Sequence, residues 1–159
     1  MKKKISQLLF LAILCIVLFI TDICTFFWYQ AAISYLLFSF LLCCSWYSFT
    51  PMILSLGLLL LATQALIINS GVLPGFLTQA ALLFALVILR ERLYLRNTIP
   101  ALAFLIYYLI ITYFLPLHSR PFLPESYTIM ALFGNLIAIG IFSLKLKTSR
   151  TRQSLVPIA

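Results

Sequence analysis

The residue types that usually carry chemistry are few in this sequence, and they are scattered along it. His118 stands alone in a proline-rich stretch, with no serine or cysteine at the spacing of a nucleophilic motif. The three acids, Asp22, Glu91 and Glu125, lie far apart in the chain. They therefore predict neither a carboxylate pair for acid–base catalysis nor a cage for a metal ion. No glycine-rich phosphate-binding motif occurs. We expect a protein that is not an enzyme and that needs no cofactor.

The four cysteines add no reactive motif. Cys15, Cys24, Cys43 and Cys44 show no C-x-x-C spacing, so the sequence predicts neither a zinc site nor a redox-active dithiol. Cys15 and the adjacent pair lie within apolar runs, where a free cysteine behaves as a small hydrophobic residue.

Composition places the chain in a membrane. Of 159 residues, 64% are hydrophobic and only 9% are charged, and the mean hydropathy is +1.15. Such long apolar runs are typical of transmembrane helices. We expect an all-α integral membrane protein, with one transmembrane helical domain over residues 1–146 and a short basic cytoplasmic tail over 147–159. The first apolar run lacks the small residues of a signal-peptide cleavage site at 20–24, which predicts an uncleaved helix.

The apolar runs predict a compact bundle of six transmembrane helices. The second run is the shortest and is either a tilted span or a re-entrant segment, and the bundle has five spans if this run does not cross. Pro51 suits a helix start, Thr98 suits an N-cap, and Asn-Ser-Gly at 69–71 with Pro74-Gly75 predicts a turn. The predicted spans cover residues 5–20 with an extension to 27, 31–44, 51–68, 76–89, 100–115 and 127–144.

The cations fix the expected topology. With six spans, the basic residues of 2–4, 90–96 and 145–152 fall on one side, and Arg120 alone falls on the other. A five-span chain would separate the first lysines from the other two clusters. Because short cytoplasmic loops carry the excess of Lys and Arg, this asymmetry predicts six spans with both termini in the cytoplasm. The net charge of +8 is then a topology signal that also suits anionic lipid, and we expect no nucleic acid as partner.

Polar residues near the apolar runs are candidate intramembrane sites. Gln64 and Asn135 lie within predicted spans, and Asn69 follows one. An amide in a span either hydrogen-bonds to a neighbouring helix, which contributes about 0.6–2 kcal/mol, or contacts a ligand. No ionisable residue is clearly buried in a span, with Asp22 at the boundary, so the sequence does not predict a self-contained ion pump.

The densest cluster of charge is a candidate docking segment. Arg90, Arg92 and Arg96 exceed what orientation requires, because two other basic segments mark the same side. An arginine can grip a carboxylate through two hydrogen bonds. We therefore expect this segment to dock a cytoplasmic partner, with Glu91 setting the register. The alternative is that the arginines contact only anionic lipid.

The order of these features resembles that of a known family. A span with Gly57 leads to Gln64, to the turn at 69–71, and to a span that ends in a basic stretch within 86–97. With its basic start and its tail at 145–152, the chain resembles the MreD family, the small rod-shape-determining membrane proteins of bacteria. The resemblance covers most of the chain, in pattern more than in identity. The family often has an acid where this chain has Gln64.

The resemblance implies a non-catalytic protein of the bacterial cytoplasmic (inner) membrane. Such a protein acts through contacts with other membrane proteins in the machinery of cell shape and wall elongation, and its implied partner is an MreC-like protein. The family is similar in fold to the substrate-binding S-components of energy-coupling-factor vitamin transporters, which supplies the alternative function. An S-component needs a polar pocket on its outer face, for which the candidates are Asn69, His118, Arg120 and Glu125.

Overall fold

The structure is a computed structural model, and it describes residues 2–29, 35–47, 50–68, 73–90, 98–110 and 125–154. These ranges contain helices and no strand, which confirms the all-α prediction. The helices are α1 (Lys2–Tyr29), α2 (Leu36–Tyr47), α3 (Pro51–Ile68), α4 (Leu73–Arg90), α5 (Ile99–Leu109) and α6 (Glu125–Ser154).

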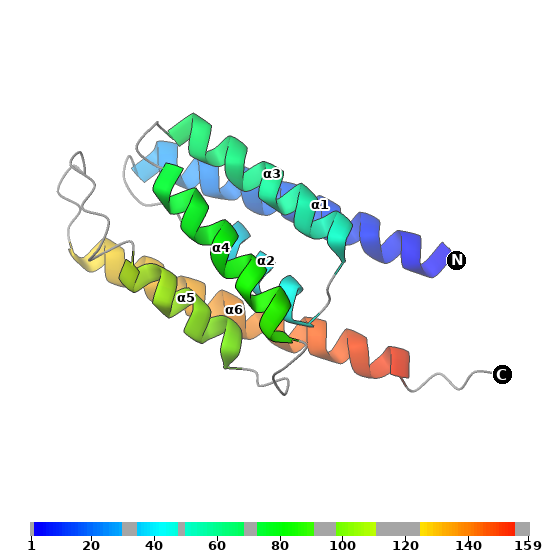
Figure 1. Cartoon of the computed structure of the whole chain (residues 1–159). Helices are drawn as coiled ribbons and strands as arrows, with labels where there is room; N and C mark the ends of the chain where they lie inside the picture. The colour runs from blue at the N-terminus through cyan, green and yellow to red at the C-terminus, as the bar shows by residue number, and fades with distance from the viewer. Residues whose placement is uncertain are drawn as a thin grey trace.

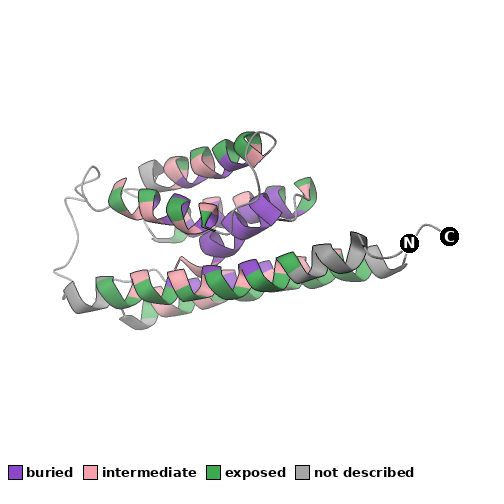
Figure 2. Ribbon diagram, turned by 90° about the horizontal axis from the view of Figure 1, so that it is seen from below, coloured by how far each residue is buried: buried purple, intermediate pink, exposed green. Residues whose placement is uncertain are grey.

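Helix α2 occupies the centre of the bundle. It contacts all five of the other helices, most extensively α6, and every residue from 37 to 47 is buried. Figure 2 shows this buried segment crossing between outer helices whose outward faces are exposed. A helix that is apolar on nearly all sides has no face for water, and such a helix is stable only when it is enclosed.

The length of α2 differs from the predicted span at 31–44. The helix has 12 residues, which rise by about 18 Å, whereas the hydrocarbon core of a bilayer is about 30 Å thick. The helix is therefore shorter than the hydrocarbon core is thick, and it lies inside the bundle. Figure 1 shows that α1 and α3 run in the same direction. Helix α2 therefore runs back between them, and successive helices alternate in direction.

Other boundaries also differ from the predictions. The turn predicted at Pro74-Gly75 is wrong, because both residues belong to the first turn of α4, where the missing N–H of proline removes no helical bond. Helix α6 continues to Ser154, so the basic tail from residue 147 is helical over its first eight residues. Helix α5 begins at Ile99, and Thr98 precedes it without a side-chain capping bond. The predicted span over 100–115 extends past residue 110, outside the described residues.

Helix α1 begins and helix α6 ends at the same end of the bundle (Figure 1). Helix α4 ends there at Arg90, and α5 begins there. Lys145 and Lys147 lie in the part of α6 that approaches this end. This cationic end, as we call it, gathers helix residues from the three basic segments of the sequence.

The outer surface of the bundle is largely apolar. Large hydrophobic side chains are exposed on α1, α3, α4, α5 and α6, for example Leu66 at 80% and Met130 at 72%. Among the described residues, α1 over Ile5–Phe27 and α6 over Ile129–Lys147 are long and apolar enough to cross a membrane. The remaining four helices are apolar but shorter.

Candidate functional site

A buried carboxylate holds the start of the central helix. Asp22 of α1 is fully buried. Its Oδ1 accepts a hydrogen bond from the backbone N–H of Leu36, and its Oδ2 accepts one from that of Leu37, each at 3.0 Å. The first N–H groups of a helix have no intrahelical acceptor, and the helix dipole favours an anion there. Asp22 therefore caps α2 from a neighbouring helix. The expectation that no ionisable residue is clearly buried is wrong at this position.

The depth of α2 explains why it needs a cap from elsewhere. Asp22 lies seven residues before Tyr29, the last residue of α1, a distance of about 10 Å along that helix. Helix α2 therefore begins well inside the bundle, where its N–H groups have little access to water. Tyr35, the residue before it, has a positive φ of 51°, a conformation that costs a non-glycine residue about 1–2 kcal/mol. Tyr35 thus holds a strained backbone conformation directly before the helix that Asp22 caps.

Polar side chains connect α2 to α6. The hydroxyl of Ser39 donates to Oδ1 of Asn135 at 2.9 Å, and Nδ2 of Asn135 donates to a carbonyl one turn earlier in α6. One turn further along α2, the sulfur of Cys43 lies 3.7 Å from the carbonyl oxygen of Ile139 and 3.6 Å from Oγ of Ser143. These residues form what we call the α2–α6 polar seam: Ser39, Cys43, Asn135 and Ser143. Small side chains along such a seam allow two helices to pack closely.

A second contact between helices joins α4 to α5. Nε2 of Gln79 donates to the hydroxyl of Tyr107 at 2.8 Å, and both side chains are buried. The ring of Tyr107 packs on Phe38 of α2 with centroids 4.6 Å apart, and on Tyr35 at 5.5 Å. Tyr107 thus buries its ring and satisfies its hydroxyl, so α5 is fixed to both α4 and α2.

Three buried polar atoms find no hydrogen-bond partner among the described residues: Nε1 of Trp46, Oγ1 of Thr50 and Oε1 of Gln64. Gln64, a candidate from the sequence, is 6% exposed on α3. Gln64 therefore lies inside the bundle, away from the outer surface. A buried amide oxygen without a donor costs about 1–3 kcal/mol.

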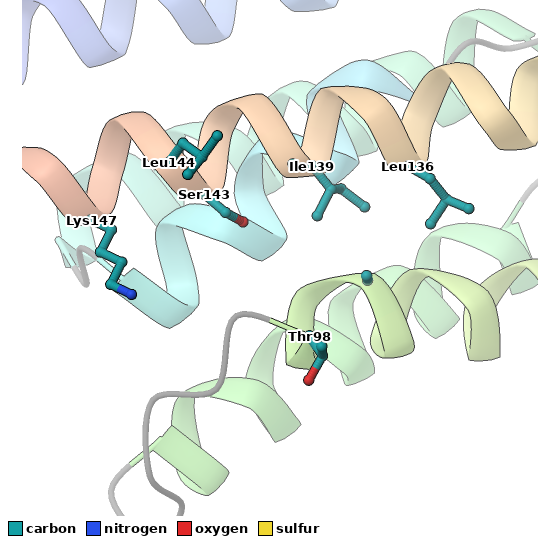
Figure 3. Close-up of a pocket in the computed structure, with 8 residues that line it drawn as sticks. Thr98, Leu136, Ile139, Ser143, Leu144 and Lys147 are labelled. Carbon is teal, nitrogen blue, oxygen red and sulfur yellow. The ribbon is translucent and has the colours of Figure 1, made fainter.

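A groove opens between α5 and α6 near the cationic end (Figure 3). Its volume is about 320 Å³. Helix α6 supplies one wall, and Thr98 and Ala101 at the start of α5 supply the other. The wall from α6 consists of Leu136, Ile139, Gly140, Ser143, Leu144 and Lys147.

The structure places some of the residues predicted from the sequence inside the bundle and does not bring them together. Asn135 belongs to the α2–α6 polar seam, and Gln64 is buried on α3. Of the docking candidates, Arg90 is the half-buried last residue of α4. The candidates Glu91, Arg92, Arg96, Asn69, His118 and Arg120 lie outside the described residues, and Glu125 begins α6.

The residues that sequence reasoning missed are Asp22 and the small residues of α2. The partners of Asp22 are backbone groups of a later helix, and such a contact leaves no side-chain pattern to read. The seam left a weak signal, because Ser39, Cys43, Cys44 and Ser45 are small residues within an otherwise bulky apolar run, which is typical of a helix packed closely on others. No cluster of three potential metal ligands forms within the described ranges.

Comparison with known proteins places the chain in no family. No family model, no curated protein sequence and no solved structure matches it.

Proposed function

We propose that the chain is a six-helix integral membrane protein that acts through contacts with other membrane proteins and carries out no chemical step. The observation that carries the membrane assignment is the distribution of polarity. Asp22, Ser39, Gln64, Gln79 and Asn135 are buried, whereas most of the large exposed side chains are apolar. A soluble protein rarely exposes contiguous apolar patches of this extent. In lipid, the same distribution keeps polar groups away from hydrocarbon and presents apolar side chains outside.

The proposed orientation has both termini and the segment 90–96 in the cytoplasm. Ten of the eleven cations lie in the three basic segments of the sequence, and the helix ends that carry these segments lie at the cationic end (Figure 1). The positive-inside rule assigns that end to the cytoplasm. Asp22 and the start of α2 lie toward the opposite end.

The finer proposal is an MreD-like function in the bacterial cytoplasmic membrane. It rests on the family resemblance of the sequence, namely the basic start, the order of glycine, amide, turn and basic stretch, and the basic tail. In this function the protein links the cell-shape machinery to wall synthesis, and its partner is an MreC-like protein with one membrane span. The segment 90–96 is the proposed docking site for a cytoplasmic partner.

The alternative, a vitamin-binding S-component, gains no support from the described residues. Its pocket would lie at the end opposite the cationic end, and its candidates Asn69, His118 and Arg120 are outside the described residues. The groove between α5 and α6 lies near the cationic end instead.

Crosslinking in intact bacterial membranes, followed by purification of the tagged chain, tests the proposed function. We expect a single-span MreC-like protein among the crosslinked products. Capture of an ATPase with its membrane coupling subunit would instead establish the S-component function. A tagged chain that stays soluble after membranes are removed would contradict the membrane assignment itself.

A further inference from the structure

Three of the four cysteines lie in the core of the bundle. Cys15 of α1 and the adjacent pair Cys43 and Cys44 of α2 are at most 4% exposed, whereas Cys24 of α1 is exposed. The three buried thiols belong to one cluster of buried side chains. A buried cysteine can serve simply as a small apolar side chain, and the proposed function uses none of these thiols.

The cap at the start of α2 fixes the register between α1 and α2. Asp22 of α1 accepts the N–H groups of Leu36 and Leu37, and the two helices run in opposite directions. Cys15 precedes Asp22 by seven residues in α1. Cys44 follows Leu37 by seven residues in α2. Seven residues make nearly two full turns and rise by about 10 Å, so both cysteines return to the face that carries the cap, at the same depth. Cys15 therefore lies opposite Cys44.

The environment of Cys43 supports this pairing. Its sulfur lies 3.7 Å from the carbonyl oxygen of Ile139 and 3.6 Å from Oγ of Ser143, so Cys43 faces α6. Successive residues are about 100° apart around a helix, and Cys44 therefore faces a different neighbour. Cys44 interacts electrostatically with Cys15, more strongly than with Cys43 beside it in the chain.

Facing positions on packed helices suit a disulfide. The axes of two packed helices are about 8–10 Å apart, and the Cα atoms of each lie about 2.3 Å from its axis. Cα atoms that face one another are then about 3.5–5.5 Å apart, which overlaps the range of about 4.4–6.8 Å that disulfides adopt. Helix packing of this kind allows two facing thiols to be joined without separating the helices.

A disulfide suits this pair better than a metal ion does. A metal would require both thiols to ionise, and an apolar core disfavours charge. No cluster of three potential ligands forms in the part of the chain that the structure describes. Two thiols and the disulfide that replaces them are all uncharged.

We propose that Cys15 and Cys44 form a redox-sensitive lock, in which oxidation joins α1 to the central helix α2 by a disulfide. The oxidant is a lipid-soluble quinone, because thiols enclosed by apolar side chains are poorly accessible to oxidants in water. Two S–H bonds break and one S–S bond forms. The thiols give up two protons and two electrons, and the quinone takes up both to become a quinol. The choice of a quinone rests on the proposed membrane location, whereas the pairing of the thiols does not.

The lock should stabilise the fold when it is closed. A disulfide between residues 15 and 44 would limit the conformations open to the unfolded chain. It would also add a second connection between α1 and α2, beside the cap that Asp22 provides. We expect oxidation to raise the melting temperature.

The test is a count of thiols in the full chain after it is incubated in liposomes with a short-chain ubiquinone. The chain is then unfolded, its remaining thiols are labelled with N-ethylmaleimide, and its peptides are identified by mass spectrometry. We expect the labelled thiols to fall from four to two, and a linked pair of peptides to contain Cys15 and Cys44.

Two adjacent positions provide matched variants. Cys44→Ala should keep all three of its remaining thiols, and the quinone should leave its melting temperature unchanged. Cys43→Ala removes the buried thiol beside it that faces α6, and it should still lose two thiols and melt at a higher temperature after oxidation. The linked peptides of the unmodified chain identify the pair even if a variant does not fold.

Retention of all four thiols would overturn the lock. Linkage through Cys43, or between two chains through Cys24, would overturn the pairing. A mass increase from quinone bound to one thiol would show that the thiols react singly, which also contradicts the lock. A chain that never enters the liposomes contradicts the proposed function instead, and the same thiol count in detergent then tests the pairing by itself.

Discussion

The carboxylate of Asp22 accepts the N–H of Leu36 on one oxygen and the N–H of Leu37, the next residue, on the other, both at 3.0 Å. One residue of α1 thereby satisfies the first turn of a helix that begins inside the bundle. Burial of a carboxylate costs several kcal/mol, and two charge-assisted bonds together with the helix dipole offset that cost. The cap thus joins α1 to the helix that contacts all five of the others.

We expect Asp22→Ala to destabilise the bundle by about 1–3 kcal/mol, because it leaves one buried and one part-buried N–H group without an acceptor. Asp22→Asn keeps one carbonyl acceptor and should lose less. Thermal unfolding in detergent measures the difference. Thr21→Ala is the control, since Thr21 bonds only to a carbonyl of its own helix. An Asp22→Ala variant as stable as this control would show that the cap does not hold α2.

The helices could be predicted from the sequence, whereas the cap that Asp22 provides could not. The all-α class and the run that begins at Pro51 follow from apolar length and helix-start chemistry, which are local. The cap is not local, because Asp22 and Leu36 are 14 residues apart, and a cap supplied by a different helix has no sequence signature. For α2, the sequence predicts a short apolar run. Whether that run spans the membrane or is enclosed by other helices depends on the five other helices, and an apolar composition suits both cases.

The α2–α6 polar seam should contribute a measurable coupling energy. A double-mutant cycle of Ser39→Ala and Asn135→Leu isolates the hydrogen bond between these side chains, and we expect a coupling of about 0.6–1.7 kcal/mol in unfolding free energy. Ser55→Ala serves as the control, since Ser55 is exposed and bonds within its own helix. Additive effects of Ser39→Ala and Asn135→Leu would mean that the bond contributes nothing to stability.

Gly57 sets the approach of α3 to α2. A Cβ atom at this position would collide with both δ carbons of Leu41, whose side chain is fully buried. We expect Gly57→Ala to lower the melting temperature, because overpacking a close contact costs about 1–3 kcal/mol. Gly134→Ala should be neutral or stabilising, since its Cβ meets nothing and alanine favours a helix by about 1 kcal/mol over glycine. If both substitutions stabilise the protein, α2 and α3 do not pack as closely as described.

The docking role of the segment 90–96 predicts that arginine and lysine are not equivalent at these positions. Replacing Arg90, Arg92 and Arg96 with lysine keeps the charge, and hence the topology, but removes the planar group that binds a carboxylate in two places. We expect the triple variant to insert normally and to lose most of its crosslinked cytoplasmic partner. Lys145→Arg is the reverse control and should change neither property. Full partner recovery by the triple lysine variant would leave only lipid contact for this segment.

The orientation of the bundle in the membrane is the central claim, and sandwich fusions of alkaline phosphatase test it most directly. This enzyme is active only outside the cytoplasm. Six helices with a cytoplasmic cationic end predict high phosphatase activity for a fusion at His118 and none for fusions at Arg96 or after Ala159. Phosphatase activity at Arg96 or after Ala159 would contradict the account.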